Sequence, residues 1–330
     1  MHERMTDMKF LKKIAVFLLH IPLVLLLLLL IAWVGLLVAK LVAYPDYMQN
    51  KENVCTLPDI HAGYVPQGLD HVESDTYLLS GYNGHDMLSL YISQNGESKK
   101  ILPVDRNGKL LESHGGGVTS AGDFVYVTDE SELIIFSLSD LKNAKDGDKV
   151  ACIGTFPVDT AASFCFADGS YLYVGEFYYA DHYEIDLSHS FTTPAGDRHR
   201  ALISCYPLAD DGSIADAYPL YSISVTSMVQ GFAVKGDTFI ISRSWGLNSS
   251  KLEFYTGLKE THTTIGVSGK KVPLYYLDST NLEKTVTMPA FSEDLDIVGD
   301  RVIVSFESAC NKYIVGKLFW ADKVISYPIS

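Results

Sequence analysis

The stretch Phe291–Ser308, FSEDLDIVGDRVIVSFES, decides the fold, because its pattern recurs along the chain. An alternating segment leads to a turn at Gly299-Asp300, and a second segment, Val302–Phe306, returns. Alternating segments joined by a Gly-Asp turn are typical of a β-hairpin. Four further copies begin at Gln67, Gly117, Ser163 and Gly231. Five hairpins at intervals of roughly 50–65 residues predict a β-propeller.

The sequence therefore predicts an all-β fold, a propeller of five four-stranded blades preceded by one transmembrane helix. Six blades are the alternative, if an insertion near His189–His199 or Gly257–Gly269 hides a further repeat. We expect Asn53–Ile60 to be an outer strand that closes the ring, and Ser139–Asp146 to hold one helical turn. The predicted blades cover residues 67–104, 117–157, 163–225, 230–289 and 293–328.

An apolar segment, Ile14–Ala39, has His20 as its only clearly polar side chain. As a helix it would be about 39 Å long, more than the roughly 30 Å of a bilayer's hydrocarbon core. Four bases precede it, at Arg4, Lys9, Lys12 and Lys13. This asymmetry predicts a single-pass protein of the cell membrane, with a cytoplasmic N-terminus and the remainder outside. A cleaved signal peptide is the alternative, but the chain offers only a poor cleavage site.

These patterns divide the chain into four parts. Residues 1–13 form a basic cytoplasmic N-terminus, and residues 14–39 form the anchor. Residues 40–60 form a stalk with the ring-closing strand, and residues 61–330 form the propeller.

The part beyond the anchor is strongly acidic. Residues 1–45 hold five bases and two acids, so that 21 bases and 38 acids remain, a net charge of −17. This balance argues against nucleic acid as a partner. It favours cations, neutral sugars, peptides or basic proteins, although acidity that only keeps an exported domain soluble is the alternative.

Five cysteines are scattered without a CxxC pair. This spacing argues against a zinc ribbon and against a disulfide-dense scaffold. Cys152 and Cys165 lie in strand-like segments, where we expect small buried side chains.

Aligning the repeats predicts which side chains meet at one mouth of the channel. One residue of each innermost strand falls at the same position, just before the start of the pattern. These five are Gln67, Gly116, Ser163, Gln230 and Glu293, with His114 and Asp294 as neighbours. A second set comes from the ends of the returning strands: Tyr82, Asp129, Glu130, Glu176, Arg243 and Glu307. A ring of polar side chains that bind only water and one another is the alternative to a ligand site.

No established catalytic motif is present. His114-Gly-Gly-Gly is not read as an oxyanion hole, because no G-x-S-x-G pentapeptide accompanies it. We expect these glycines to allow close backbone approach. Phosphate-loop, H-E-x-x-H and EF-hand motifs are also missing. The residues Glu176, Glu293, Asp294 and Glu307 could hold a hard cation such as calcium.

Three short motifs carry a family resemblance: Val65-Pro66-Gln67-Gly68, His114-Gly115-Gly116, and Phe306-Glu307-Ser308-Ala309 with Tyr313. With them the chain resembles exported or membrane-anchored bacterial β-propeller proteins of unassigned function, in the neighbourhood of YncE-like and SMP-30-like propellers. The resemblance covers most of residues 60–316 and implies the fold more than any chemistry.

Two functions follow as hypotheses. The first is an extracytoplasmic binding or scaffold module for a cell-envelope protein, peptide or carbohydrate. The second is a calcium-dependent hydrolase of the nucleotidase or lactonase kind, with a metal at the acidic mouth. The absence of a nucleophile–base motif favours the first.

Overall fold

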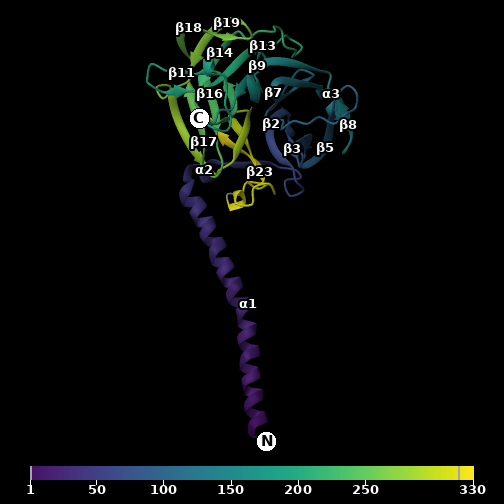
Figure 1. Ribbon diagram of the computed structural model, residues 1–330, viewed down its shortest axis with the longest axis vertical. Helices are drawn as coiled ribbons and strands as arrows, with labels where there is room; N and C mark the ends of the chain where they lie inside the picture. The colour runs from purple at the N-terminus through teal and green to yellow at the C-terminus, as the bar shows by residue number, and fades with distance from the viewer. Residues whose placement is uncertain (1, 319) are drawn as a thin grey trace. The chain divides into compact units, whose positions relative to one another are not determined.

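The structure is a computed structural model that describes residues 2–318 and 320–330, with side chains from residue 20 onward (Figure 1). The chain separates into two compact units, residues 1–48 and residues 49–330. We describe each unit by itself.

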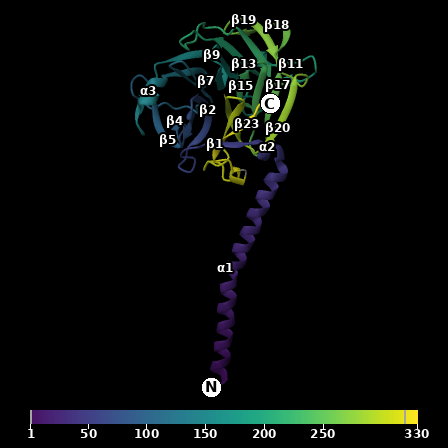
Figure 2. The same cartoon turned by 180° about the vertical axis from the view of Figure 1, so that it is seen from behind.

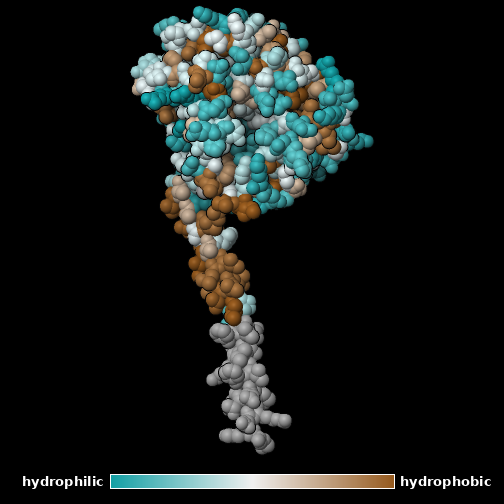
Figure 3. Space-filling view, in the orientation of Figure 1, coloured by the Kyte–Doolittle hydropathy of each residue, from teal (hydrophilic) through white to brown (hydrophobic). Residues whose placement is uncertain are grey.

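The first unit is dominated by one helix, α1 (His2–Ala43), which is followed by the short α2 (Pro45–Asn50). Within α1, residues His20–Ala43 have a mean hydropathy of 3.0, and this stretch is long and apolar enough to cross a membrane. Figure 3 shows it as brown surface. The predicted anchor, residues 14–39, lies inside α1. The side chains of Arg4, Lys9, Lys12 and Lys13 lie outside the described ones.

The second unit is built almost entirely from strands, which account for 53% of the protein. A first sheet contains β2 (Val65–Glu73), β3 (Thr76–Asn83), β4 (Met87–Gln94) and β5 (Glu97–Val104). A second contains β15 (Val229–Lys235), β16 (Thr238–Arg243), β17 (Ser250–Thr256) and β20 (Leu282–Met288). A third contains β21 (Ser292–Val298), β22 (Arg301–Phe306), β23 (Lys323–Pro328) and β1 (Glu52–Thr56). In each, neighbouring strands are antiparallel, as the repeated hairpin predicts.

The pairing of β1 with β23 joins the two ends of this unit in one sheet. Glu52 lies opposite Ser326, and Asn53 lies opposite Ile325. The strand predicted near residues 53–60 is therefore present, although it ends at Thr56.

The remaining strands form one larger sheet in the order β18-β19-β14-β13-β10-β9-β7-β6. Its members are β6 (Val118–Ala121), β7 (Phe124–Ser137), β9 (Gly154–Ala167), β10 (Tyr171–Glu176), β13 (Ala201–Pro207), β14 (Tyr221–Val225), β18 (Lys259–Val267) and β19 (Lys270–Tyr276). A separate pair, β11 (Phe191–Thr192) and β12 (Arg198–His199), lies in the predicted insertion near His189–His199.

Strand β7 reverses direction within its range. Fourteen extended residues would span about 46 Å, yet the N–H of Leu138 donates to the carbonyl of Asp123 at 2.8 Å. Glu130, near the middle, has a left-handed backbone with φ of 50°. The predicted second blade, residues 117–157, therefore has two antiparallel strands within β7, and the predicted helical turn follows as α3 (Leu138–Asn143).

Two predicted blade assignments are corrected. The end of the predicted second blade, residues 117–157, is divided, because β8 (Lys149–Ala151) pairs in parallel with β5 of the first sheet while Gly154–Pro157 pairs with β7. The insertion near Gly257–Gly269 forms the hairpin β18–β19, which leaves its own sheet and pairs in parallel with β14. In both cases the added strand covers an otherwise open sheet edge.

The hydrophobic core lies between successive sheets. Neighbouring residues Leu78 and Leu79 belong to two different clusters, because alternate side chains of β3 face opposite sides. Leu79 packs with Tyr64 and Ile303, toward the last sheet, while Leu78 packs with Val125, toward the next one. All five cysteines are free and buried, which confirms the expectation for Cys152 and Cys165.

The innermost strands contact one another in sequence: β2 contacts β6, β6 contacts β9, β9 contacts β15, β15 contacts β21, and β21 contacts β2. The sheets of this unit lie side by side (Figures 1 and 2). This is an arrangement of the β-propeller type.

The glycine at the start of the repeat explains how closely these strands approach. A Cβ on Gly68 would lie 2.6 Å from the backbone nitrogen of Val118 on the next strand. A Cβ on Gly117 would lie 2.6 Å from the Cα of Phe164, and one on Gly231 would lie 2.8 Å from the Cα of Asp294. Each glycine thus admits the backbone of its neighbour.

Candidate functional site

A cavity of about 920 Å³ lies where the innermost strands and the ends of the returning strands meet. Most of the predicted site residues line it: Gln67, Tyr82, His114, Ser163, Glu176, Gln230, Glu293 and Glu307. Gly116, Asp129 and Glu130 line it as well. The register taken from the repeats therefore brings these residues to one place.

Asp294 and Arg243 are not among the lining residues. Asp294 follows Glu293 directly on β21, at the point where the register with β22 shifts between Ser292 and Leu295. There it is fully buried and accepts the N–H groups of Leu69, at 3.2 Å, and Leu295, at 3.0 Å. Arg243 pairs with Glu253, with 2.7 Å between Nη2 and Oε1. Both residues stabilise contacts within the fold rather than facing the cavity.

Asp294 belongs to a set of buried carboxylates that connect the innermost strands. Asp296 of β21 accepts the N–H of His71 on β2 at 2.6 Å. Asp70 of β2 accepts the N–H of Ser120 on β6 at 3.1 Å. Backbone donors therefore satisfy these acids, as buried carboxylates require.

Two glutamates form a carboxyl pair in the cavity wall. Burial and the nearby charge of Glu307 raise the pKa of Glu293 well above its usual range, and a hydrogen bond joins the two side chains. Burial also raises the pKa of Glu307 to about 7, although Lys312, Tyr313, Gln67 and Glu293 all oppose the rise. Gln67 donates to Oε2 of Glu307 at 3.0 Å. Two buried carboxyl groups this close cannot both ionise, so the pair shares a proton.

Beside this pair lies a cation flanked by aromatic rings. The ammonium group of Lys312 bonds to the hydroxyl of Tyr82 and lies 4.7 Å from the centre of that ring and 5.4 Å from the ring of Tyr313. His114 stacks on Tyr82 at 4.5 Å, and its Nε2 lies 3.3 Å from Oδ1 of Asp86. These contacts hold the predicted residues Tyr82 and His114 in place.

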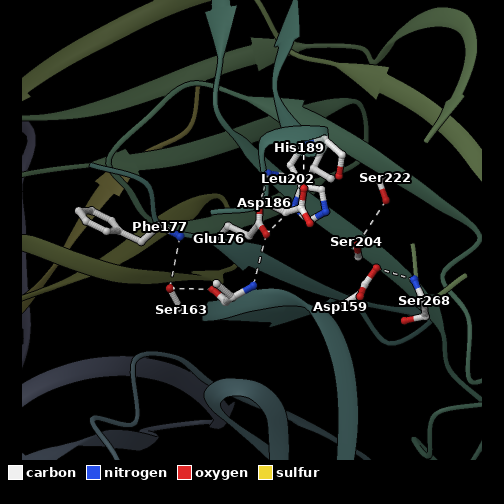
Figure 4. Close-up of polar contacts among 12 residues, drawn as sticks. Asp159, Ser163, Glu176, Phe177, Asp186, His189, Leu202, Ser204, Ser222 and Ser268 are labelled. Carbon is white, nitrogen blue, oxygen red and sulfur yellow. Dashed lines mark hydrogen bonds and ion pairs between the residues drawn. The ribbon is translucent and has the colours of Figure 1, made fainter. Parts of the chain in front are cut away.

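On another wall, Glu176 and His189 form a buried pair (Figure 4). Nδ1 of His189 lies 2.8 Å from Oε1 of Glu176, while Oε2 accepts the N–H of Leu202 at 2.9 Å. Burial disfavours the charged imidazolium, but the hydrogen bond and the charge of Glu176 outweigh it, so the pKa of His189 is raised. The carboxylate thus orients the imidazole through its Nδ1.

Ser163 and Thr160 supply hydroxyl groups from β9. The hydroxyl of Ser163 donates to the carbonyl of Ala161 at 2.9 Å and accepts the N–H of Phe177 at 3.3 Å, so backbone groups engage it (Figure 4). Thr160 is only 2% exposed, and its Oγ1 has no hydrogen-bond partner among the described residues. A buried hydroxyl without a partner in a cavity wall marks a place for a ligand atom or water.

An aromatic cluster forms the rim. Trp245, Phe177 and Tyr183 line the cavity. Tyr179 stacks on Trp245 with 4.4 Å between the ring centres, and Tyr183 and Phe177 form a T-shaped pair with 5.3 Å between their ring centres. Tyr183 remains half exposed, so the cluster offers aromatic surface to a bound molecule.

The lining is strongly acidic. It contains ten carboxyl residues: Asp86, Glu112, Asp129, Glu130, Asp159, Glu176, Glu184, Asp186, Glu293 and Glu307. Lys312 is the one lysine or arginine among the described lining residues. Low-dielectric walls that carry one sign of charge concentrate counter-ions of the opposite sign.

These carboxyl groups are distributed around the cavity rather than gathered. Within the part of the chain whose side chains are described, no group of three or more His, Cys, Asp and Glu side chains is arranged to hold a metal ion. The four predicted metal ligands, Glu176, Glu293, Asp294 and Glu307, therefore do not form one ligand set.

Sequence reasoning missed Lys312, His189 and Trp245, which lie in segments outside the hairpin repeat. Lys312 comes five residues after Glu307, and Trp245 comes two residues after Arg243, so each follows a returning strand. The position just after a returning strand could therefore have predicted that these two residues line the cavity. His189 lies in the insertion, in the short helical segment η1 (Leu187–His189), where the repeat gives no register.

Neither a comparison with protein-family models nor one with curated proteins finds a match. Among solved structures, the chain is similar to the PQQ-bound aldose sugar dehydrogenase of Streptomyces coelicolor, with 14% identity, a TM-score of 0.45, and coverage of 84% of this chain and 96% of that one. It is also similar to a GH43_1 enzyme from Xanthomonas citri, with 10% identity, a TM-score of 0.41, and coverage of 88% and 93%. A third is BamB from Moraxella catarrhalis, with 10% identity, a TM-score of 0.32, and coverage of 79% and 82%. None of these places the chain in the YncE-like or SMP-30-like neighbourhood, and at such values no ligand or activity is carried over.

Proposed function

We propose that the protein is a membrane-anchored binding module whose cavity takes a positively charged ligand, such as a polyamine or a basic peptide segment from the cell envelope. The observation that carries the proposal is the lining, in which ten carboxyl residues face one lysine. A bound cation would relieve the repulsion among these groups, whereas an anion would add to it.

Two further features support a ligand of this class. Trp245, Phe177 and Tyr183 line the cavity together with the acidic residues Glu184 and Asp186. A desolvated cation over such rings gains about 0.5–2 kcal/mol. The unpartnered hydroxyl of Thr160 offers an acceptor for an N–H donor of the ligand.

We also infer that the sheets form a closed ring of five blades. The cyclic contacts of β2, β6, β9, β15 and β21 support it. The pairing of β1 with β23 supports closure, because it completes the last sheet with a strand from the opposite end of the unit. Strand β9 would then serve two blades, pairing with β7 through its first half and with β10 through its second.

The proposal places residues 49–330 outside the cell. The length and composition of His20–Ala43 support a membrane span, and the bases before it together with the acidic unit behind it support the orientation. Ligands of the cell envelope would then reach the cavity directly.

The test is calorimetric titration of the full chain in detergent with three probes: spermine as the cation, maltotetraose as a neutral sugar, and citrate as an anion. We expect spermine alone to bind, with weaker binding at high salt because the charges are screened. Glu130→Gln removes one lining charge and should weaken spermine binding by a few-fold. Glu97→Gln makes the same change on an exposed strand outside the cavity and should leave binding unchanged.

If maltotetraose binds and spermine does not, the cavity is a carbohydrate site and the proposal is replaced. If Glu97→Gln weakened spermine binding as much as Glu130→Gln, the interaction would be with the acidic surface in general. Failure of all three probes to bind would remove the cationic ligand class.

A further inference from the structure

The segment between β22 and β23 carries a group of exposed apolar side chains. Ile314 is 80% exposed, Val315 53%, Leu318 50% and Trp320 44%, around the short helical turn η2 (Gly316–Leu318). In Figure 3, brown surface lies at the edge of the domain where Figure 1 draws this yellow segment. Exposed apolar residues scattered singly are ordinary in soluble proteins, but a contiguous group marks an interaction surface.

This segment is bound to the part of the domain nearest the membrane helix along the chain. The N–H of Leu57 donates to the carbonyl of Asp322 at 3.0 Å, and the N–H of Asn311 donates to the carbonyl of Ile60 at 3.1 Å. The rings of His61 and Trp320 stack at 5.3 Å. The two ends of the segment are thus fixed against residues 57–61.

The chain itself limits how far this surface can lie from a bilayer. The apolar span ends at Ala43, and Leu57 follows fourteen residues later. Fourteen residues reach at most about 50 Å when fully extended. A surface fixed to residues 57–61 is therefore held at high local concentration beside the membrane that contains α1.

The composition of the segment matches the membrane interface. Trp320 has an amphipathic ring of the kind enriched at headgroup level. Lys317 lies between the apolar residues, and its ammonium group contacts the side-chain oxygen of Asn311 at 2.6 Å. A lysine beside apolar side chains can extend its charge to the headgroups while the stem stays in the apolar region.

We propose that the side chains of Ile314, Val315, Leu318 and Trp320 insert into the headgroup region of the same membrane that α1 spans and give the domain a second membrane contact. The proposal rests on the membrane anchor of the proposed function but is independent of what the cavity binds. Inserted side chains would transfer apolar surface out of water and restrict the domain's orientation on the bilayer.

The test uses the full chain reconstituted in vesicles of phosphatidylcholine with a minor share of phosphatidylglycerol, at a density near one chain per vesicle. Leu318→Cys and Leu247→Cys each carry a polarity-sensitive fluorophore. The two leucines are equally exposed, at 50%, and Leu247 lies on a different loop. The five native cysteines are buried, and the labelled parent chain measures any background.

With brominated lipid, we expect emission from position 318 to fall about twofold or more, because interfacial residues lie within roughly 5–10 Å of the acyl boundary. Aqueous iodide should quench that position weakly and position 247 strongly. If both positions are quenched equally by brominated lipid and by iodide, in protein that remains attached to the vesicles when they float, the proposal is overturned while the anchor stands.

Two other outcomes would also overturn it. Loss of flotation would show that α1 does not hold the chain in the bilayer, and both the anchor and the second contact would fall together. Protection of position 318 that appears only at high protein density would assign the apolar surface to contact between copies of the chain.

Discussion

At the scale of single residues, Glu307 links stability to pH. Its pKa is about 7 in the folded protein, against an ordinary value near 4.5. Between pH 4.5 and 7 the folded state therefore binds more protons than the unfolded state. The stability that protonated Glu307 contributes is fully present below about pH 4.5 and is lost as pH rises through 7. Glu307→Gln should flatten the decline in urea midpoint between about pH 5 and 8.

Glu97→Gln, which removes an exposed carboxylate, is the matched control. Its urea midpoint should fall with pH as steeply as that of the parent protein. Burial also raises the pKa values of Asp70, Asp294 and Asp296, and these residues are unchanged in both variants. The difference between the two slopes therefore reports the titration of the Glu293–Glu307 pair. Parallel curves for both variants and the parent would contradict the assignment.

Glu176 stabilises the fold through three hydrogen bonds. It accepts the N–H of Leu202, the N–H of Ala161 and the ring nitrogen of His189. Each buried donor left without a partner costs about 1–3 kcal/mol, so Glu176→Ala should lower the free energy of unfolding by roughly 2–5 kcal/mol. Chemical denaturation measures the change.

Glu112→Ala is the control for Glu176→Ala, because Glu112 also lines the cavity but is exposed. It should stay within about 0.5 kcal/mol of the parent. If both variants were equally stable, the hydrogen bonds of Glu176 would contribute little and its place in the cavity wall would need another explanation.

Residue positions were predictable where the repeat fixed them. Gln67, Ser163, Gln230 and Glu293 follow from one register, and all four line the cavity. The prediction that Asp294 lines the cavity was wrong, because at the register shift between Ser292 and Leu295 its carboxylate accepts the N–H groups of Leu69 and Leu295 inside the fold. Nothing local in the sequence shows which of the two faces inward.

At the scale of elements, the repeat glycines can be tested in matched pairs. Gly231 of β15 has the Cα of Asp294 2.8 Å from an added Cβ, whereas Gly266 of β18 has nothing within 4 Å. Neither has a positive φ, so the two differ in packing. Gly231→Ala should destabilise by about 1–3 kcal/mol or more because β15 and β21 must separate.

Gly266→Ala should change the free energy of unfolding by less than about 0.5 kcal/mol in either direction. Thermal and urea unfolding of both variants would measure the difference. Equal destabilisation would mean that the loss comes from strand backbone in general and not from the contact between innermost strands.

The hairpins themselves were readable from alternation and Gly-Asp turns, because those signals are local. The sharing of β9 between two pairings and the transfer of β18–β19 to the edge of β14 were not. Such pairings join segments far apart in the chain, and the sequence of either partner carries no mark of the other.

At the scale of the whole molecule, the cavity distinguishes an organic cation from a metal ion. Because no group of three potential ligands gathers in the described side chains, we expect calcium to leave the melting temperature of the full chain unchanged. Spermine at a hundred times its dissociation constant should raise the free energy of unfolding by about 2.7 kcal/mol and so raise the melting temperature. A calcium shift that Glu293→Gln removes would favour the metal-dependent hydrolase instead.

The topology of the molecule gives the last prediction. His20–Ala43 has the length of a membrane span, four bases precede it, and residues 46–330, with a net charge of −17, follow it. Protease added to intact expressing cells should therefore cut exposed loops between Asp181 and Arg200 and spare an epitope on residues 1–12. A fragment beginning near residue 45 and free in the medium would mean that the segment is a cleaved signal. Protection of residues 181–200 until the cells are lysed would reverse the orientation, because those loops would then lie on the cytoplasmic side.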